Sequence, residues 1–209
     1  MGLPLSAFSV RNLHVPFHDE KKRAQILPFE LESRLLLPAE QVASVSFVTT
    51  RGKDGTGLVA FAAEKIMLNS LLAEKEGNLA FRALYPAAYA LARQVQLEAN
   101  LDQSHVTLLL YADVFSVSFI CLRGNTPFFF REITLSEFWQ DEDVALILSP
   151  SSGEHRLIQE LWQNIRLCSR ISGHEFKPEK VLIAGPLAQS PILSSFLAQF
   201  ADCPIERAQ

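Results

Sequence analysis

The stretch HVTLLLYADVFSVSFICLRGNTPFFFREI (residues 105–133) decides the fold, because it contains three apolar runs separated by very short connections. Each run is short and rich in β-branched or aromatic residues, which predicts strands at 105–111, 114–122 and 127–133. Connections as short as residues 112–113 and 123–126 require neighbouring strands to be antiparallel. The stretch therefore predicts an antiparallel β-meander.

The residues after the meander predict a helix, a strand and a second helix. A polar loop at 149–153 precedes a helical pattern over 154–172, a short apolar strand follows at 180–184, and Ser190-Pro191 opens the last helix. A meander followed by helix, strand and helix is the order of one lobe of the ribonuclease-H-like fold, the repeat unit of actin-like ATPases. The expected fold class is therefore α/β, with α and β elements mixed.

The residues before the meander predict a strand–helix–strand–strand unit. We expect a strand at 3–15, a helix at about 19–36 and strands at 42–50 and 57–63, with Asp54-Gly55 marking a hairpin between the last two. A helix at 64–76 should bury its leucines, and a strand at 79–84 and a further helix should follow. The expected domains are 1–63 for this unit, 64–100 for the rest of a first lobe, and 101–209 for a second lobe.

Composition narrows the class of protein. The chain has 209 residues, 48% of them hydrophobic, and a net charge of −4 without a basic tract, which gives no electrostatic footprint for nucleic acid. No apolar run is long enough to cross a bilayer, and the N-terminus lacks a signal-peptide pattern, so a cytosolic protein is expected.

Three widely spaced cysteines, Cys121, Cys168 and Cys203, predict buried free thiols. The phenylalanine excess should be housed partly in the meander, at Phe115, Phe119 and Phe128–Phe130.

Other patterns that suggest chemistry are better explained as structure. The segment 51–57 lacks the Gly-Lys-Ser/Thr of a phosphate loop and no helix follows it directly, which favours a polar hairpin turn. His14 and His18 do not share a helical face, because a proline lies between them. Glu30 and Glu32 are two positions apart and diverge on a helix. We therefore expect no metal site and no catalytic residue.

Two segments carry a resemblance to a known family. The segment 13–22, LHVPFHDEKK, and the hexad 27–32, LPFELE, resemble the entry into the strand–helix–strand–strand (SHS2) subdomain of PilM and GspL. These are actin-like proteins of type IV pilus and type II secretion inner-membrane platforms. The order of the later elements also matches over nearly the whole chain. The resemblance implies an actin-like fold.

The chain departs from the ATP-binding members of this family where nucleotide would bind. The first Asp-x-Gly phosphate turn of those proteins has no counterpart here, so we expect an N-terminally incomplete actin-like fold. The second falls on Tyr111-Ala112-Asp113, where a carboxylate replaces glycine and should repel phosphate. The adenosine-side Gly-Gly turn falls on Gly185-Pro186, where proline removes a backbone N–H. These four degenerate positions, Tyr111, Asp113, Gly185 and Pro186, predict that no cofactor binds.

The resemblance implies a non-catalytic scaffold at the cytoplasmic face of the bacterial inner membrane. Its implied partners are the secretion or pilus assembly ATPase and other inner-membrane platform proteins, with a homodimer as a further expectation and no nucleic acid. One alternative is an actin-like pilus assembly protein regulated by ATP. Another is a ribonuclease-H-like nuclease or a sugar-kinase-like enzyme. Nucleases of this kind keep a metal-binding carboxylate at the position of Asp113, but the following strand offers no converging carboxylate, which favours a turn there. For the partner surface, Phe17 and Phe29 of the strand–helix–strand–strand unit are either groove residues or core.

Overall fold

The computed structural model describes residues 2–73, 85–98, 105–135, 152–172, 175–200 and 202–207. The chain divides into two compact units, Met1–Gln94 and Val95–Gln209, which are described separately below. The division falls inside helix α3 (Ala87–Glu98). The three domain ranges expected from the sequence stay a prediction.

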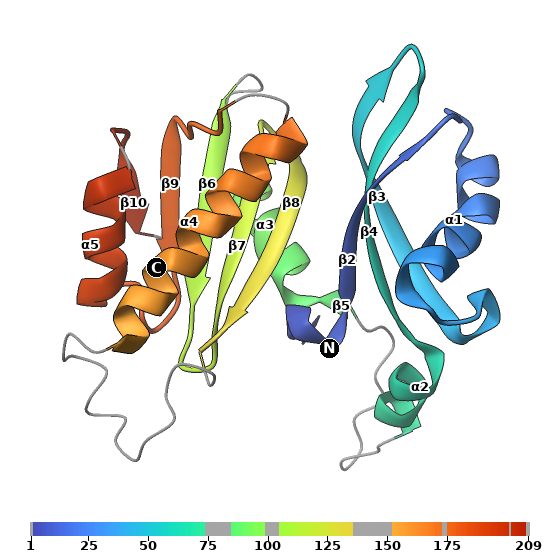
Figure 1. Ribbon diagram of the computed structural model, residues 1–209, viewed down its shortest axis with the longest axis horizontal. Coiled ribbons are helices and arrows are strands. Elements are labelled where there is room, and N and C mark those ends of the chain that lie inside the picture. The colour runs from blue at the N-terminus through green and yellow to red at the C-terminus, as the bar shows by residue number, and fades with distance from the viewer. Residues whose placement is uncertain are drawn as a thin grey trace. The chain divides into compact units, whose positions relative to one another are not determined.

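The first unit is built on a three-stranded antiparallel sheet with the order β2-β4-β3. Its strands are β2 (Ser9–Val15), β3 (Val42–Gly52) and β4 (Gly55–Glu64), and α1 (Glu20–Leu35) covers one face (Figure 1). The order β2-α1-β3-β4 confirms the predicted strand–helix–strand–strand arrangement. The predicted first strand is interrupted, because a 3₁₀ turn at Leu5–Ala7 separates β2 from the short β1 (Gly2–Leu3), which pairs with β5 (Tyr85–Pro86).

Helix α1 begins and ends with recognisable caps. The Asp19 side chain accepts a hydrogen bond from the Lys22 N–H at 2.9 Å, which satisfies a free amide of the first turn. Leu27 and Leu31 face the sheet and are buried, as the helical spacing predicts, and the helix continues through its internal proline. Leu36 ends the helix in the left-handed conformation, with a φ of 57° and 92% of its surface exposed.

The β3–β4 hairpin forms one residue earlier than the Asp54-Gly55 pattern predicts. Gly52 pairs with Gly55, so the loop residues are Lys53 and Asp54. Gly55 adopts a φ of 143°, and a Cβ at this position would lie 2.2 Å from the Val15 carbonyl oxygen. The glycine is therefore needed because the end of β2 passes directly against the start of β4.

The face of the sheet opposite α1 carries an aromatic cluster. The Phe47 ring stacks on Tyr89 of α3 with centroids 3.9 Å apart, and Phe61 makes edge contacts with Phe8, Phe47 and Tyr89. Phe61 is only 1% exposed. The strands of this unit therefore bury apolar side chains on both faces, against α1 and against this cluster.

Helix α2 (Lys65–Ala73) contradicts the predicted burial of its leucines. It contains no buried residue, Ile66 is 81% exposed and Leu72 is 42% exposed. Helical spacing indicates which side chains share a face, but it does not say whether another element packs on that face. The predicted strand at 79–84 lies outside the described residues.

The second unit is a mixed five-stranded sheet with the order β10-β9-β6-β7-β8. The meander consists of β6 (Val106–Ala112), β7 (Ser116–Arg123) and β8 (Thr126–Thr134), and β9 (Lys180–Ala184) and β10 (Ile205–Arg207) add in parallel beside β6. Helices α4 (Ser152–Ser172) and α5 (Pro191–Phe200) complete it. This strand order confirms the predicted ribonuclease-H-like lobe.

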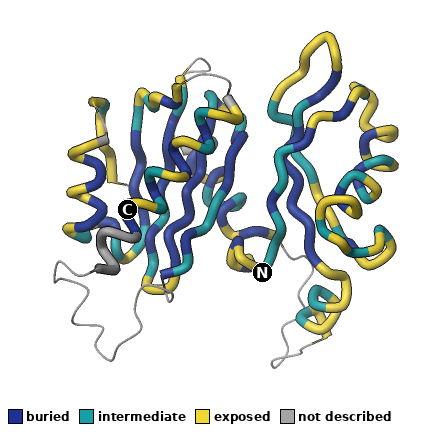
Figure 2. The backbone as a smooth tube through the Cα atoms, viewed as in Figure 1, coloured by how far each residue is buried: buried dark blue, intermediate teal, exposed yellow. Residues whose placement is uncertain are grey.

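Both faces of this sheet are buried (Figure 2). Leu108, Cys121 and Phe129 align across the strands in the core formed with α4 and α5. Leu109, Ile120 and Phe130 align on the opposite face and are at most 1% exposed. The Phe128–Phe130 run therefore lies in a strand covered on both sides, as the sequence predicts.

Among the helices of the described segments, none combines the length and the apolar content that crossing a bilayer requires.

Candidate functional site

Parallel pairing of β6 and β9 brings the two predicted nucleotide turns together. Tyr111 pairs with Ala184, so the next residues along each strand, Ala112 and Gly185, lie side by side where the strands end. In α/β sheets, ligands bind outside the carboxyl ends of parallel strands. The degenerate positions predicted from the sequence therefore form one site, which we call the strand-end site (Tyr111–Ser116 and Gly185–Ala188).

The carboxylate of Asp113 organises the first half of the strand-end site. Its Oδ1 accepts hydrogen bonds from the Phe115 N–H at 2.7 Å and the Ser116 N–H at 2.8 Å. The Asp113 N–H donates to the Ser116 carbonyl at 3.0 Å and closes the turn. This is an Asx-type turn, in which a side chain satisfies amides that the strands do not use.

The two amides held by Asp113 are the donors that a phosphate would need. Successive backbone N–H groups at a strand end form an anion-binding concavity when they are open. Here one oxygen of the Asp113 side chain already accepts from both amides. The Asp113 carboxylate therefore already accepts from both of these donors, and its predicted repulsion of phosphate stays a prediction.

The second half of the site is closed by contact with the first. Gly185 has a φ of 96°, and a Cβ there would lie 2.4 Å from the Ala112 carbonyl oxygen. The Leu187 N–H donates to that same oxygen at 3.1 Å, and the Ala188 N–H donates to the Gly185 carbonyl at 3.0 Å. Pro186 has no N–H to offer. The amides of residues 186–188 are therefore absent or engaged within the fold.

The tip of the first turn presents apolar side chains to solvent. Val114 is 48% exposed and Phe115 is 72% exposed, so Phe115 lies at the surface, in the turn between the first two strands of the meander. The strand begins at Ser116 rather than at 114, which leaves Phe115 in the turn. Its carbonyl still accepts a hydrogen bond from the Leu135 N–H at 2.7 Å, which fixes the backbone.

Sequence reasoning missed the part played by backbone amides, because an amide has no side-chain signature. A usable signal was present, since Asp113 followed by Ser116 is typical of an Asx-type turn. The pattern could be recognised, but which donors the carboxylate takes depends on the strand end, which only the structure locates.

His18, in the segment before α1, has a hydrogen-bond partner in the first unit. His18 Nδ1 lies 3.1 Å from the Thr56 hydroxyl oxygen, and that hydroxyl donates to the Phe17 carbonyl at 2.8 Å. Thr56 is fully buried, so these contacts tie the start of β4 to the segment before α1. Within the described segments, no three His, Cys, Asp or Glu side chains gather as a metal ion would require.

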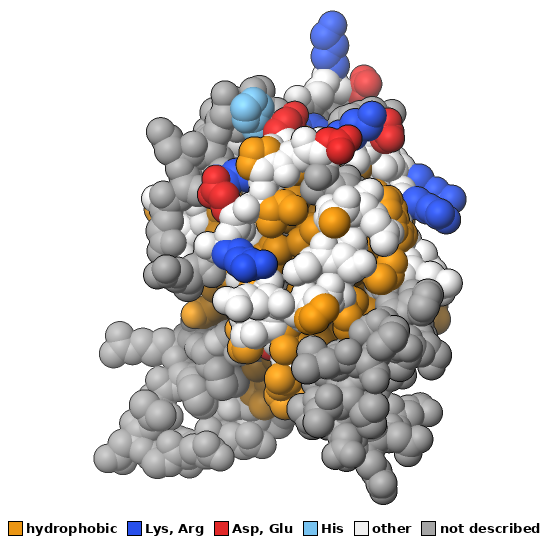
Figure 3. Space-filling model, turned by 90° about the vertical axis from the view of Figure 1, so that its left-hand side faces the viewer, with side chains coloured by type: hydrophobic (Ala, Val, Ile, Leu, Met, Phe, Trp, Pro, Cys, Tyr) orange, Lys and Arg blue, Asp and Glu red, His pale blue; other side chains and the backbone are white. Residues whose placement is uncertain are grey.

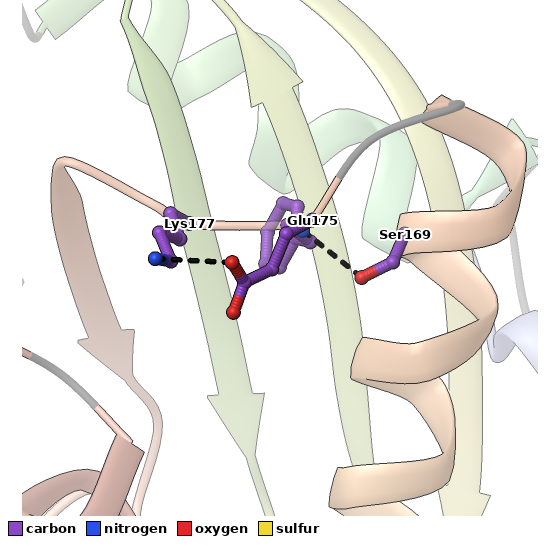
Figure 4. A network of polar contacts seen from close by, with 4 residues as sticks. Ser169, Glu175 and Lys177 are labelled. Atoms are coloured by element: carbon purple, nitrogen blue, oxygen red, sulfur yellow. Dashed lines mark hydrogen bonds and ion pairs between the residues drawn. The ribbon is translucent and has the colours of Figure 1, made fainter.

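Two hollows of the second unit lie outside every site predicted from the sequence. One, of about 510 Å³, is lined by Ile183, Leu197 and Ile205 among others, on the side that carries α5 and β10 and exposes hydrophobic side chains (Figure 3). The other, of about 600 Å³, lies between α4 and the segment after it, where Lys177 pairs with Glu175 at 3.0 Å (Figure 4).

Comparison with known structures gives a strong likeness. The chain aligns with a chain of the PilM–PilN type IV pilus biogenesis complex with a TM-score of 0.76 and 20% sequence identity, covering 97% of this chain and 66% of that one. The chain has a PilM-like fold. It spans about two thirds of the length of that relative.

Two further structures are more distant. The cytoplasmic domain of EpsL, an inner-membrane component of the type II secretion system of Vibrio cholerae, aligns with a TM-score of 0.49 and 13% identity, covering 88% of this chain and 60% of that one. A Bacteroides thetaiotaomicron protein with an actin-like ATPase fold aligns with a TM-score of 0.49 and 12% identity, covering 94% and 64%. No protein-family model and no curated protein sequence matches.

The PilM-like fold confirms the predicted resemblance and the predicted fold class.

Proposed function

We propose that this chain is a non-catalytic scaffold of an inner-membrane assembly platform of the type IV pilus or type II secretion kind. Two observations support the proposal. The chain has a PilM-like fold over 97% of its length. The Asp113 carboxylate accepts hydrogen bonds from both amides of the turn at which the sequence predicts a nucleotide phosphate would bind.

The observation on Asp113 carries the non-catalytic part. A phosphate approaching this turn meets a negative charge and finds the Phe115 and Ser116 amides already bonded. Pro186 removes another donor from the adenosine side of the site. In this proposal, the lobe keeps the fold of a nucleotide-binding protein but works by holding partners together, at the cytoplasmic face of the membrane.

An alternative is that the chain binds ATP and that nucleotide controls its partners. The specific observation in its favour is geometric, because the two strand-end turns meet at the position expected for a nucleotide, with a glycine at the close approach. Binding would then require the Asp113 turn to open.

A thermal-unfolding titration of the full chain with ATP and Mg²⁺ separates the two proposals. A ligand at about 100 times its Kd stabilises the folded state by about 2.7 kcal/mol, so binding would raise the Tm in a concentration-dependent way. The scaffold proposal expects the same Tm with Mg²⁺ alone and with Mg²⁺ and ATP. A Tm that rises with ATP concentration would contradict it and support the alternative.

The proposed partners are the assembly ATPase and the membrane proteins of the platform. Phe29 of α1 is 64% exposed, so the reading of this side chain as core is wrong and it is available for contact. We expect Phe29→Ala to reduce capture of the N-terminal domain of the assembly ATPase in a pulldown. Phe115→Ala is the matched control, because Phe115 is an exposed phenylalanine in the other unit, with 72% of its surface exposed. Equal capture by Phe29→Ala and the unaltered chain would refute this surface.

A further inference from the structure

Two cysteines of the second unit lie in contact inside its core. Cys121 is on β7 and Cys168 is in the C-terminal half of α4, 47 positions later, and their Sγ atoms are 3.4 Å apart. Both are free thiols and both are fully buried. The sequence predicted buried thiols but gave no sign that two of them meet.

The position of the pair is fixed from both sides. Cys121 is on an interior strand of the sheet, aligned with Leu108 and Phe129 on the face that packs against α4. Beside Cys168, the Ser169 hydroxyl donates to the Ile165 carbonyl at 3.0 Å. It also accepts from the Phe176 N–H at 2.9 Å (Figure 4). The sheet and the end of α4 therefore hold the two sulfurs against each other.

We propose that Cys121 and Cys168 form a reversible redox cross-link that ties α4 to the centre of the sheet. Oxidation joins the two sulfurs, each thiol loses one proton, and the two electrons reduce a low-molecular-weight disulfide to two thiols. A disulfide bond is about 2.05 Å long, so the sulfurs have to approach by only about 1.4 Å. A dithiol reductant reverses the reaction by exchange.

Burial makes this cross-link slow to form and slow to break. The pKa of the Cys121 thiol is raised well above its usual value. The main cause is loss of hydration on burial, and the neighbouring Cys168 thiol is the second cause. The attacking species is the thiolate, so exchange requires the end of α4 to move away from the sheet for long enough to admit the oxidant. The pair is therefore oxidised by sustained rather than brief exposure to the oxidant. Formation of the cross-link shows that the end of α4 has moved away from the sheet.

The test uses the full chain carrying Cys203→Ser, so that only the pair remains. The protein is incubated with oxidised glutathione, free thiols are then blocked with N-ethylmaleimide in denaturant, and the intact mass and the peptide map are measured. The expected result is the joint loss of both free thiols, a peptide linking Cys121 to Cys168, and recovery of both thiols with dithiothreitol. The matched controls, Cys121→Ala and Cys168→Ala in the same background, should give no internal cross-link.

Three results would overturn the proposal. In the first, the treated protein keeps its native circular dichroism and both thiols still react fully with N-ethylmaleimide. In the second, each cysteine carries its own glutathione and no linked peptide is found. In the third, the native signal is lost before the cross-link appears, which would assign the cross-link to the unfolded chain.

Discussion

At the scale of single residues, Asp113 is the side chain on which the strand-end site depends. Its Oδ1 accepts two backbone hydrogen bonds at 2.7 and 2.8 Å. A carboxylate that accepts from backbone amides in this way contributes about 1–2 kcal/mol to stability.

Asp113→Ala is therefore expected to lower the free energy of unfolding by about 1–2 kcal/mol. Asp113→Asn should lose less, because its amide oxygen still accepts from the same donors. Urea unfolding of the three proteins measures the differences. Equal stability of Asp113→Ala and the unaltered chain would show that the turn does not depend on this side chain.

Gly185→Ala is expected to lower the free energy of unfolding by more than Asp113→Ala does. Its φ of 96° disfavours any residue with a side chain, and the added Cβ would meet the Ala112 carbonyl oxygen at 2.4 Å. We expect a loss of about 2–3 kcal/mol. Gly52→Ala is the matched control, because its Cβ would meet its first neighbour at 3.9 Å, and it should stay within about 0.5 kcal/mol. Similar urea midpoints for both variants would contradict the close approach.

At the scale of elements, the C-terminal cap of α1 is strained, and a substitution there should increase stability. Leu36 is the cap residue in the left-handed conformation, which costs a residue with a Cβ about 1–2 kcal/mol, and its side chain is 92% exposed. Leu36→Gly should therefore stabilise the protein by about 0.5–1 kcal/mol, after the greater chain entropy of unfolded glycine is included. Leu36→Ala keeps the strain and should change little. A destabilised Leu36→Gly in urea unfolding would show that the exposed leucine makes a contact.

The same helix offers a sharp contrast between its two faces. Leu31 is fully buried against the sheet, whereas Phe29 is 64% exposed. Leu31→Ala should lower stability by about 2–5 kcal/mol, and Phe29→Ala should stay within about 0.5 kcal/mol. Thermal unfolding of both variants checks this. A strongly destabilised Phe29→Ala would return the residue to the core and remove it from the proposed partner surface.

Elements were predictable from the sequence where the chain itself carries the signal. The strand at 180–184 and the meander were found because apolar runs are bounded by turn residues, as at Gly124-Asn125. Errors arose where a neighbour decides the outcome. Helix α2 has the expected pattern but no buried residue, because burial depends on a partner element that the pattern does not encode.

That the candidate positions lie close together could be predicted from the sequence, whereas their hydrogen bonds could not. The four positions that the sequence predicts to be degenerate lie at two strand ends, and parallel pairing of β6 and β9 brings these ends together. That Asp113 takes the amides of Phe115 and Ser116 follows from where β7 begins, two residues later than predicted. This shift of two residues determines which backbone amides remain available to donate a hydrogen bond to the Asp113 side chain.

At the scale of the whole molecule, each of the two units has its own apolar interior. The Cys121–Cys168 pair lies in the unit Val95–Gln209, which also contains Trp162. The fluorescence of Trp162 therefore reports on the unfolding of the unit that would carry the cross-link.

The cross-linked protein is expected to resist denaturant more strongly than the reduced one. A bond that closes a loop of 47 positions stabilises by about 4 kcal/mol through the unfolded chain, less any strain in the folded state. The fluorescence midpoint in urea should rise after oxidation and return with dithiothreitol. An unchanged midpoint in protein shown to be cross-linked would mean that strain offsets the whole effect.

The Asp113 turn also determines how the protein responds to its surroundings. A side chain attached to the turn competes for the two amides at an effective concentration on the order of millimolar or higher, whatever the solution contains. Free anions, including nucleotides at cellular levels, have to outcompete this tethered ligand. Under the scaffold proposal, the exposed tip at Val114 and Phe115 therefore keeps one conformation when nucleotide levels in the cell change.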